Sequence, residues 1–337
     1  MINEIIKELA LKAIDEKLFP GVVIGITDPE KTLFMEKYGT LDEKKPTEFN
    51  SLYDIASLTK VTATLPAMLK LIQDGKVDLS DKVSDHTEFP NDDIRIWHLM
   101  THTSGMPPYS LAYQFKDTRE EIIDEIKKEQ FKELPQTRVR YSCLNYILLM
   151  DVINSITGNF REYVRNEVFK PLGMDDTDYL PEISENIAPT SLRDGLLLRG
   201  KVDDELAYYL GGISGNAGLY SNLTDMLKYA RELLNPVKVL SKPMMNTATR
   251  PWTKDIPGDD KGLGWMLYTN DSSGGSLLSE KAFGHTGFTG TSLWVDPVQE
   301  IAIVILSNRC FYSRHERITE IWRFRRTVSN ALVSHLK

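Results

Sequence analysis

Apolar residues recur at helical spacing over residues 1–19, and acidic side chains occupy many of the positions between them. An apolar stripe opposed by charged residues predicts an amphipathic helix. The acidic residues also disfavour a secretory signal peptide, whose first part is basic and whose second part is apolar. The apolar positions of the stripe are Ile2, Ile5, Ile6, Leu9, Ala13 and Ile14.

Short runs of β-branched and aromatic residues lie near both ends of the chain. Two early runs, residues 22–27 and 32–38, flank a turn that contains Pro29, and this pattern predicts a β-hairpin. Three late runs predict further strands, with a turn at Asp296-Pro297 between the last two. The late runs are residues 263–268, 291–295 and 300–306.

The chain between these runs has mostly helical periodicity. Because strands that follow one another usually pair in one sheet, the pattern predicts an α/β (α+β) fold: an antiparallel sheet flanked by helices, with an inserted all-helical domain. We expect a discontinuous sheet domain of residues 1–60 and 205–337, an inserted helical domain of residues 61–204, and a cleft between them. The helices predicted here are residues 61–74, 119–129, 144–156, 160–169 and 225–234.

The composition is that of an ordinary soluble globular protein, and we expect no nucleic-acid or membrane partner. A chain of 337 residues suffices for one large domain or two packed ones. Its 48 acidic against 40 basic residues give a net charge of −8, which repels a phosphate backbone. One basic stretch, residues 323–326, is interpreted as a solvated helix face. The longest apolar runs, residues 146–150 and 301–306, are far shorter than the roughly 20 residues of a membrane span.

Cysteine usage bears on the compartment. Only Cys143 and Cys310 are present, too few for a disulfide framework in a chain of this size. With the acidic first helix and no apolar span, this predicts a cytoplasmic protein. The oligomeric state is left open.

Ser57 and Lys60 form a Ser-x-x-Lys string at the start of a predicted helix. A spacing of three residues places both side chains on one helix face, about one turn apart. A serine hydroxyl needs a base to become a nucleophile, and lysine serves as that base when its pKa is lowered by burial, by a nearby cation or by the positive end of a helix. The pair is therefore a candidate nucleophile and base, the alternative being an N-cap serine with a surface lysine.

The same string occurs again at Ser334 and Lys337. Only the first copy follows an apolar run, residues 53–56, and opens a long helix. This context favours Ser57.

Two further strings lie at positions where side chains can face a cleft. Tyr141-Ser142 stands between a polar loop and an apolar helix, although a buried tyrosine with a bonded hydroxyl is the common alternative. His285-Thr286-Gly287 lies in a glycine-rich segment that allows the backbone to approach a ligand, or that simply connects two strands.

Metal and nucleotide chemistry have no support in the sequence. His98 and His102 are four residues apart, but no glutamate lies between them and no third ligand is indicated. The Gly-x-Ser-x-Gly elbow of α/β-hydrolases is absent, since the nearest string ends in Asn216. No glycine-rich phosphate loop occurs. We expect no metal and no cofactor.

Three motifs in order carry a resemblance to a known superfamily. Ser57-Leu58-Thr59-Lys60, Tyr141-Ser142-Cys143 and His285-Thr286-Gly287 resemble the motifs of the serine β-lactamases and penicillin-binding proteins. The resemblance is closest to the class C β-lactamase branch, with its D-Ala-D-Ala peptidases and family VIII carboxylesterases. Residues 97–106 and 210–221 are also similar to linking segments of that branch, so the resemblance extends from about residue 20 to residue 308.

The resemblance implies a β-lactamase/transpeptidase-like fold and a role for each motif residue. Ser57 would attack the substrate carbonyl, while Lys60 and Tyr141 would share the general-base and general-acid work. The backbone N–H groups of Ser57 and Phe288 would form the oxyanion hole. His285, followed by Thr286 and Gly287, would bind or orient substrate and keep the site positive.

Two positions depart from the family pattern. Cys143 stands where relatives usually have Asn or Asp, a side chain that bonds the catalytic lysine and, in β-lactamases, a substrate amide; a thiol is a poor substitute. Pro66 lies in the nucleophile helix, where it removes one hydrogen bond.

The resemblance therefore implies a serine hydrolase that acts through an acyl-enzyme on small carboxylic esters or amides, as a β-lactamase-like carboxylesterase. One alternative is an amide or peptide hydrolase of cell-wall fragments or β-lactams. Another is a non-catalytic penicillin-binding sensor on the same fold. The partner expected in each case is a small molecule.

Overall fold

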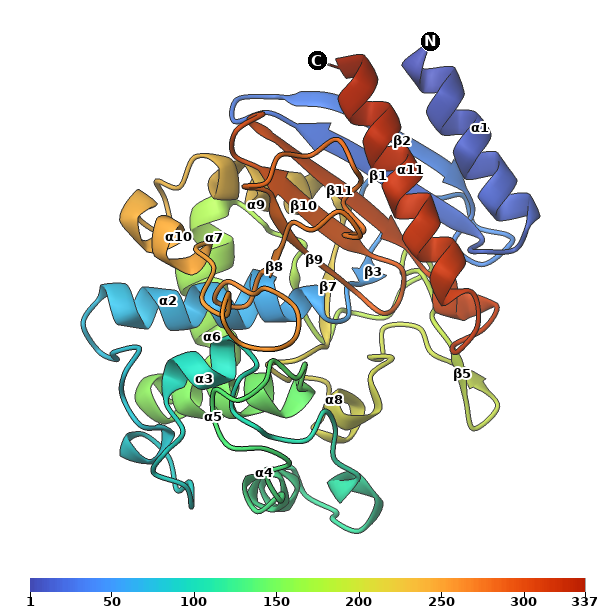
Figure 1. Ribbon diagram of the computed structural model, residues 1–337. Helices are drawn as coiled ribbons and strands as arrows, with labels where there is room; N and C mark the ends of the chain where they lie inside the picture. The colour runs from blue at the N-terminus through green and yellow to red at the C-terminus, as the bar shows by residue number, and fades with distance from the viewer. Residues whose placement is uncertain (337) are drawn as a thin grey trace.

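A computed structural model describes residues 1–336 and contains a six-stranded sheet whose strands come from both ends of the chain (Figure 1). Every neighbouring pair in it is antiparallel, and the early strand β1 pairs with the last strand β11. The strands in spatial order are β2 (Thr32–Gly39), β1 (Gly21–Thr27), β11 (Ile301–Ser307), β10 (Ser292–Asp296), β9 (Phe283–Thr286) and β8 (Met266–Leu267).

The two faces of the sheet are both buried. Along β11, Ile301, Ile303 and Ile305 belong to one hydrophobic core, and the residues between them belong to another, as the two-residue period of a strand requires. The terminal helices α1 (Ile2–Asp15) and α11 (Ile318–Leu336) pack side by side on the first face, and both chain ends lie there (Figure 1).

Helix α9 (Leu223–Leu234) covers the opposite face of the sheet. Gly25 in β1 allows this approach, because a Cβ atom at that position would lie 3.0–3.2 Å from side-chain carbons of Leu227 and Leu223. The antiparallel sheet flanked by helices is therefore confirmed.

Along the chain, a mainly helical region separates the early strands from the late strands, and it lies below the six-stranded sheet in Figure 1. Its centre is α5 (Cys143–Thr157), whose apolar residues are buried on nearly every side. One hydrophobic core continues from Val23 of the sheet to Leu149 of this helix. The other helices of the region are α2 (Leu65–Gln73), α3 (Ile96–Met100), α4 (Arg119–Lys127), α6 (Phe160–Val164) and α7 (Lys170–Leu172).

Short elements connect the helical region to the sheet. Strands β3 (Tyr53–Asp54), β7 (Leu219–Ser221) and β4 (Asp178–Tyr179) form a small sheet, and β5 (Leu192–Arg193) with β6 (Leu196–Leu197) forms a hairpin. Two further short helices, α8 (Glu205–Tyr209) and α10 (Lys242–Ala248), lie before and after α9 in the chain. The domain boundaries at residues 60 and 205 stay a prediction.

The late strands differ from the sequence pattern. Of residues 263–268 only Met266 and Leu267 pair in the sheet, because the backbone N–H groups of Leu263 and Gly264 donate instead to the carbonyls of Ala248 and Met100. Conversely, β9 was not predicted from the pattern, since Gly284 and His285 interrupt its apolar character.

The helix after Ser57 begins as a π-helical turn, Lys60–Thr64, and becomes α-helical at Leu65. The N–H of Leu65 donates to the carbonyl of Lys60, five residues back. By the same register the Val61 carbonyl faces Pro66, which has no N–H. The hydroxyl of buried Tyr229 donates to that carbonyl and replaces the missing bond.

Tyr229→Phe should therefore lower the free energy of unfolding by about 1–3 kcal/mol, since it leaves a buried carbonyl unpaired. In a Pro66→Ala background the new N–H can donate to Val61, so the same change should cost much less. Urea unfolding of the four proteins measures this coupling. Equal costs in both backgrounds would show that Tyr229 does not compensate for the proline.

Candidate active site

Ser57 lies on a tight turn between β3 and the π-helical turn. The backbone N–H groups of Leu58 and Lys60 donate to the carbonyls of Ile55 and Ser57, both at 3.1 Å. The preceding residue, Ala56, has φ of +48°, a strained value for a residue with a side chain. The carboxylate of Asp54 stabilises this strained conformation by accepting the Ala56 N–H at 2.8 Å.

Lys60 is fully buried and its ammonium group faces the nucleophile. Its Nζ lies 3.0 Å from Ser57 Oγ and donates to the carbonyl of Asn216 at 2.9 Å. The Sγ atom of Cys143 is 3.6 Å away. A buried ammonium is costly unless it is hydrogen-bonded, and these neighbours supply the partners.

Tyr141 reaches Ser57 from the other side. Its hydroxyl donates to Ser57 Oγ at 3.0 Å, and Lys60 Nζ lies 5.1 Å from the centroid of its ring. The ring packs on His102, with centroids 4.6 Å apart, and the segment that bears Tyr141 leads directly into α5. Three side chains from two separate segments thus meet at one oxygen atom.

The protonation states of this cluster differ from the expectation of a lysine with a lowered pKa. Burial is the largest single influence and lowers the pKa of Lys60, but interactions with Cys143, Tyr141 and Asp204 together outweigh it, so the pKa is raised. Burial also raises the pKa of the Tyr141 hydroxyl, which points into the protein, and of the Cys143 thiol. At neutral pH the cluster therefore holds an ammonium, a phenol and a thiol.

His285 in β9 is buried, and its ring lies 6.1 Å from that of Tyr141. Burial, followed by the charges of Lys60 and Lys261, lowers the pKa of His285 to about 3. The imidazole is neutral near pH 7, so the expectation that it keeps the site positive is wrong. The buried cations on this side are instead Lys60, Lys261 in the loop before β8, Arg309 and Arg325.

The loop between β9 and β10 touches the nucleophile turn at Gly287. A Cβ atom there would lie 2.4 Å from the Ile55 carbonyl and 2.0 Å from Thr291 Oγ1, so only glycine fits. The hydroxyls of Thr289 and Thr291 donate to the carbonyls of Asp54 and Ile55 at 2.7 and 3.0 Å. These contacts place the Gly287-Phe288 peptide beside Ser57.

Two cavities open on either side of Ser57, and Ser57, Tyr141 and Phe288 line both. The larger, about 570 Å³, is lined by apolar residues that include Trp322 and by charged residues of both signs. The smaller, about 320 Å³, is lined by Cys143 and by the acidic residues Asp203, Asp204 and Glu205. A substrate carbonyl at Ser57 can therefore extend substituents in two directions.

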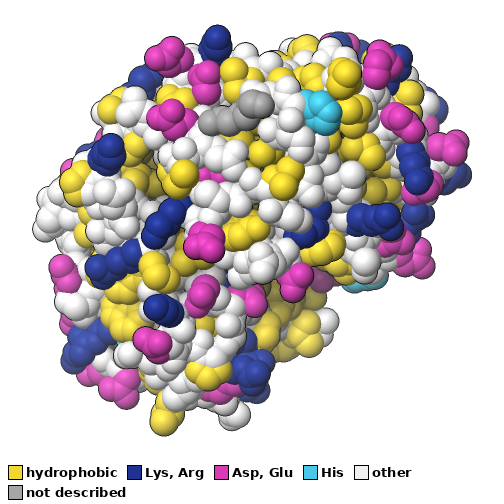
Figure 2. All heavy atoms as spheres, turned by 45° about the horizontal axis from the view of Figure 1, so that its top comes forward, with side chains coloured by type: hydrophobic (Ala, Val, Ile, Leu, Met, Phe, Trp, Pro, Cys, Tyr) yellow, Lys and Arg dark blue, Asp and Glu magenta, His cyan; other side chains and the backbone are white. Residues whose placement is uncertain are grey.

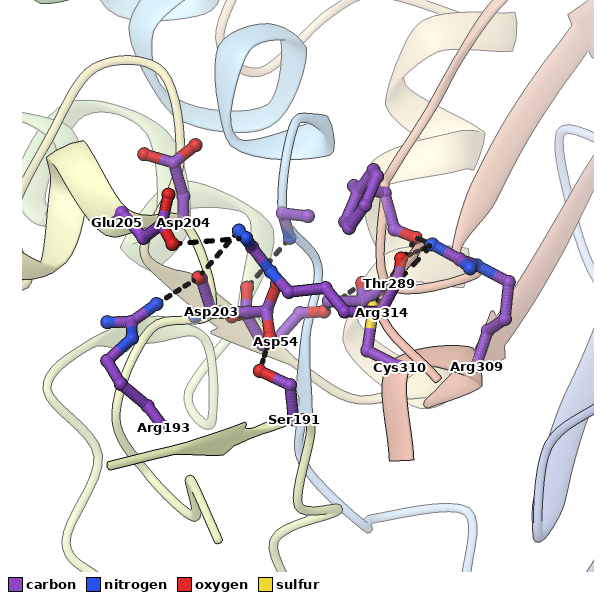
Figure 3. A network of polar contacts seen from close by, with 12 residues as sticks. Asp54, Ser191, Arg193, Asp203, Asp204, Glu205, Thr289, Arg309, Cys310 and Arg314 are labelled. Carbon is purple, nitrogen blue, oxygen red and sulfur yellow. Dashed lines mark hydrogen bonds and ion pairs between the residues drawn. The ribbon is translucent and has the colours of Figure 1, made fainter. Parts of the chain in front are cut away.

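A polar network borders the smaller cavity (Figure 3). The guanidinium of Arg314 pairs with Asp203 at 3.0 Å and with Glu205 at 3.3 Å. Asp203 also accepts the Ser191 hydroxyl at 2.5 Å, and its backbone N–H donates to the Asp54 carboxylate at 2.7 Å. Burial raises the pKa of Asp54 to about 7.

Sequence reasoning did not identify this network, nor the Asn216 carbonyl on Lys60. The one available signal was Asp54 itself, a carboxylate within an apolar run just before the nucleophile.

The interpretation of the basic stretch, residues 323–326, as a solvated helix face is wrong in part. Arg325 is only 6% exposed, because its guanidinium lies under the β9–β10 loop rather than in solvent.

The remaining candidates lie apart from this cluster. His98 accepts the Arg95 N–H at 3.0 Å and contacts Gln136, whereas His102 lies after the helix with φ of +59°, so the two do not share a helix face. Among residues 1–336 no group of three His, Cys, Asp or Glu side chains is placed to hold a metal ion. Ser334 lies near the end of α11, and its partner Lys337 lies outside the described residues.

Comparison with known proteins gives the family context. A model of the Beta-lactamase family matches residues 7–323. A Salmonella gallinarum protein named "Putative D-alanyl-D-alanine carboxypeptidase" is 35% identical, over 77% of this chain and 70% of its own length, and a Salmonella typhi protein of the same name matches equally well.

Solved structures agree in fold. The octameric penicillin-binding protein homologue from Pyrococcus abyssi has a TM-score of 0.76 at 22% identity, covering 96% of this chain and 81% of its own. EstCE1, described as a hydrolase with promiscuous acyltransferase activity, has a TM-score of 0.77 at 21% identity and covers 98% of both chains.

The raised pKa values predict how reactivity depends on pH. Since Lys60 and Tyr141 both hold their protons at neutral pH, the form that can take the Ser57 proton is a minor one that grows as pH rises towards those pKa values. The rate of Ser57 labelling by a fluorophosphonate should rise from pH 6 to pH 9 and lose this rise in Lys60→Ala or Tyr141→Phe. A rate that is highest near pH 5 would instead indicate an essential carboxylic acid.

Proposed function

The chain belongs to the β-lactamase family and is a serine hydrolase, and we propose that it forms an acyl-enzyme on Ser57 with small carboxylic esters or amides. The observation that supports this most directly is the convergence of Lys60 Nζ and the Tyr141 hydroxyl on Ser57 Oγ, each at 3.0 Å. Nucleophile and bases within hydrogen-bond reach are the arrangement that acyl transfer requires.

In the proposed reaction the Lys60–Tyr141 pair has first lost one proton to solvent, and Ser57 Oγ then bonds to the substrate carbonyl carbon while its own proton passes to that pair. The carbonyl oxygen becomes an oxyanion held by the backbone N–H groups of Ser57 and Phe288. The tetrahedral adduct then expels the alcohol or amine, which takes a proton from the same pair. Water next attacks the acyl-enzyme, gives up its proton to the pair, and releases the acid and free Ser57. Which member of the pair accepts the first proton stays open.

We favour esters as substrates because of Cys143. The Asn216 carbonyl already holds the Lys60 ammonium at 2.9 Å, so the lysine does not depend on residue 143 for its position. What a thiol at this position lacks is a strong partner for a substrate amide. An ester makes no such demand, and its alkoxide or phenoxide leaves with less protonation than an amine.

The alternative of an amide substrate has support of its own. The Salmonella relatives at 35% identity carry a carboxypeptidase name. The acidic lining of the smaller cavity also suits a peptide fragment with an amino group. In a penicillin-binding sensor, by contrast, Ser57 would be acylated without turnover, which a burst without steady-state product would reveal.

The cellular setting is part of the proposal. Cys143 and Cys310 are both free thiols, which suits a reducing compartment such as the cytoplasm. No helix within residues 1–336 is long and apolar enough to cross a membrane. On the face drawn in Figure 2, basic and acidic side chains are interspersed, without one large basic field. We propose no nucleic-acid partner.

Ser57→Ala should abolish acylation and turnover, and Lys60→Ala and Tyr141→Phe should each lower kcat by two or more orders of magnitude. Intact-mass spectrometry after exposure to a fluorophosphonate or a labelled penicillin measures acylation, and hydrolysis of p-nitrophenyl butyrate measures turnover. Ser334→Ala is the matched control and should behave as the unaltered protein. Retained activity in Ser57→Ala would overturn the proposed function.

Cys143→Asn should shift the preference from esters towards amides. An unpaired buried polar group costs about 1–3 kcal/mol, which is roughly tenfold to a hundredfold in rate, and asparagine would remove this cost for an amide substrate. The measurement is kcat/KM for p-nitrophenyl butyrate, nitrocefin and a muramyl peptide in both proteins, with circular dichroism to verify folding. If the unaltered protein hydrolyses the muramyl peptide faster than the esters, the amide alternative replaces the esterase proposal.

A further inference from the structure

The peptide group between Gly287 and Phe288 has a charged partner at its far end. Its N–H belongs to Phe288 and its C=O to Gly287. The Nη2 atom of Arg325 donates to that Gly287 carbonyl at 2.9 Å and to the Thr291 carbonyl at 2.8 Å. Arg325 comes from α11, which covers the sheet, and is 6% exposed.

A hydrogen bond at one end of a peptide group strengthens the other end. A donor on the carbonyl polarises the amide and makes its N–H a better donor, by roughly 10–30% for each bond. The bond from Arg325 is also charge-assisted, and it lies in a buried site where such bonds are strong. The guanidinium therefore both holds the plane of this peptide and draws electron density away from its N–H.

Arg309 serves the neighbouring peptide and not this one. Its Nε and Nη2 donate to the Phe288 carbonyl at 3.2 and 2.8 Å, and its Nη1 donates to the Glu316 carbonyl at 2.7 Å (Figure 3 shows the place of Arg309 in the network). These contacts tie the loop after Phe288 to residues 313–316. They do not reach the Gly287 carbonyl. That carbonyl also accepts the Gly290 N–H at 3.1 Å, but this donor is neutral, so the charge-assisted part of the polarisation of the Phe288 N–H comes from Arg325.

We propose that Arg325 is a positioning residue of the oxyanion hole, which acts on the transition state through the Gly287-Phe288 peptide. The proposal rests on the proposed function, in which the Phe288 N–H receives the oxyanion. Catalysis by such donors depends on their orientation before the reaction begins. A helix at the end of the chain thereby contributes to chemistry at Ser57 without touching the reacting atoms.

The test compares Arg325→Met and Arg325→Lys with Arg326→Met. Arg326 is the adjacent residue of α11, and it also donates to backbone carbonyls, those of Asn270 and Ser272, but to none of residues 287–291. Loss of a direct oxyanion donor costs about 10²–10³ in kcat. For Arg325→Met, which acts through the peptide, we expect a loss of about 10- to 100-fold with KM changed less than about threefold. Arg325→Lys should recover part of it, and Arg326→Met should have no effect.

A thionoester and the matching ester distinguish polarisation from general damage. Sulfur accepts hydrogen bonds weakly, so a thionoester depends little on the oxyanion hole. Arg325→Met should therefore slow the ester more than the thionoester and reduce the ratio of their rates, while Arg326→Met keeps that ratio. Thermal unfolding identifies a variant that fails to fold, in which case Arg325→Lys, which conserves the charge but not the planar fork, carries the comparison.

Each result has one meaning. Equal slowing of both substrates in a folded Arg325→Met protein would mean a structural role only, and a change confined to KM would mean substrate binding; either overturns the proposal. If Ser57 is still acylated in the unaltered protein, the proposed function survives that outcome. If Ser57→Ala retains activity, the proposed function itself fails.

Discussion

The site depends on one buried charge, the Lys60 ammonium. A fully buried lysine needs partners for its N–H groups, and here they come from Ser57, the Asn216 carbonyl and the Cys143 sulfur. The residues that meet there are up to 159 positions apart in the chain, counted from Ser57 to Asn216. The segments that bear them can approach only because the hydrophobic core continues from the sheet into the helical region. The packing of that core therefore determines whether Lys60 has the neighbours that stabilise its ammonium form.

A second constraint is the close approach of the nucleophile turn and the β9–β10 loop at Gly287. The loop is held from below by Arg325 and from the side by its own threonine hydroxyls, which donate to the turn. The nucleophile turn has a strained backbone at Ala56, and the Asp54 carboxylate stabilises it by accepting the Ala56 N–H. Rigid partners on both sides keep Ser57 and the Phe288 peptide in a fixed relation, which is what stabilisation of an oxyanion needs.

The sequence predicted the strands and helices that have a clear local hydrophobic pattern, and the site residues that belong to the three ordered motifs. The strands β1, β2, β10 and β11 and the main helices follow their hydrophobic periods, and the three motifs do converge on one place. The strand at residues 263–268 was overestimated, because tertiary contacts draw two of its N–H groups to helix ends. Partners such as Asn216 and Arg325 could not be predicted, since neither has a local pattern and each acts through contacts between distant segments. The sequence indicates which influences could lower the pKa of Lys60, but it cannot show that Cys143 and Tyr141 lie beside the ammonium group and raise that pKa.

The two cavities beside Ser57 differ in volume and in the residues that line them. On one side of Ser57 the lining combines three cations with the three acidic residues Asp259, Asp260 and Asp271, and on the other it combines three acidic residues with Arg314. The groups that perform the chemistry, Ser57, Lys60 and Tyr141, stand at the boundary. Because the two cavities differ in volume and in the side chains that line them, the two substituents of a substrate carbonyl at Ser57 meet different surroundings. Choice of substrate therefore depends on residues that take no part in bond breaking, and these can vary while the catalytic cluster stays the same.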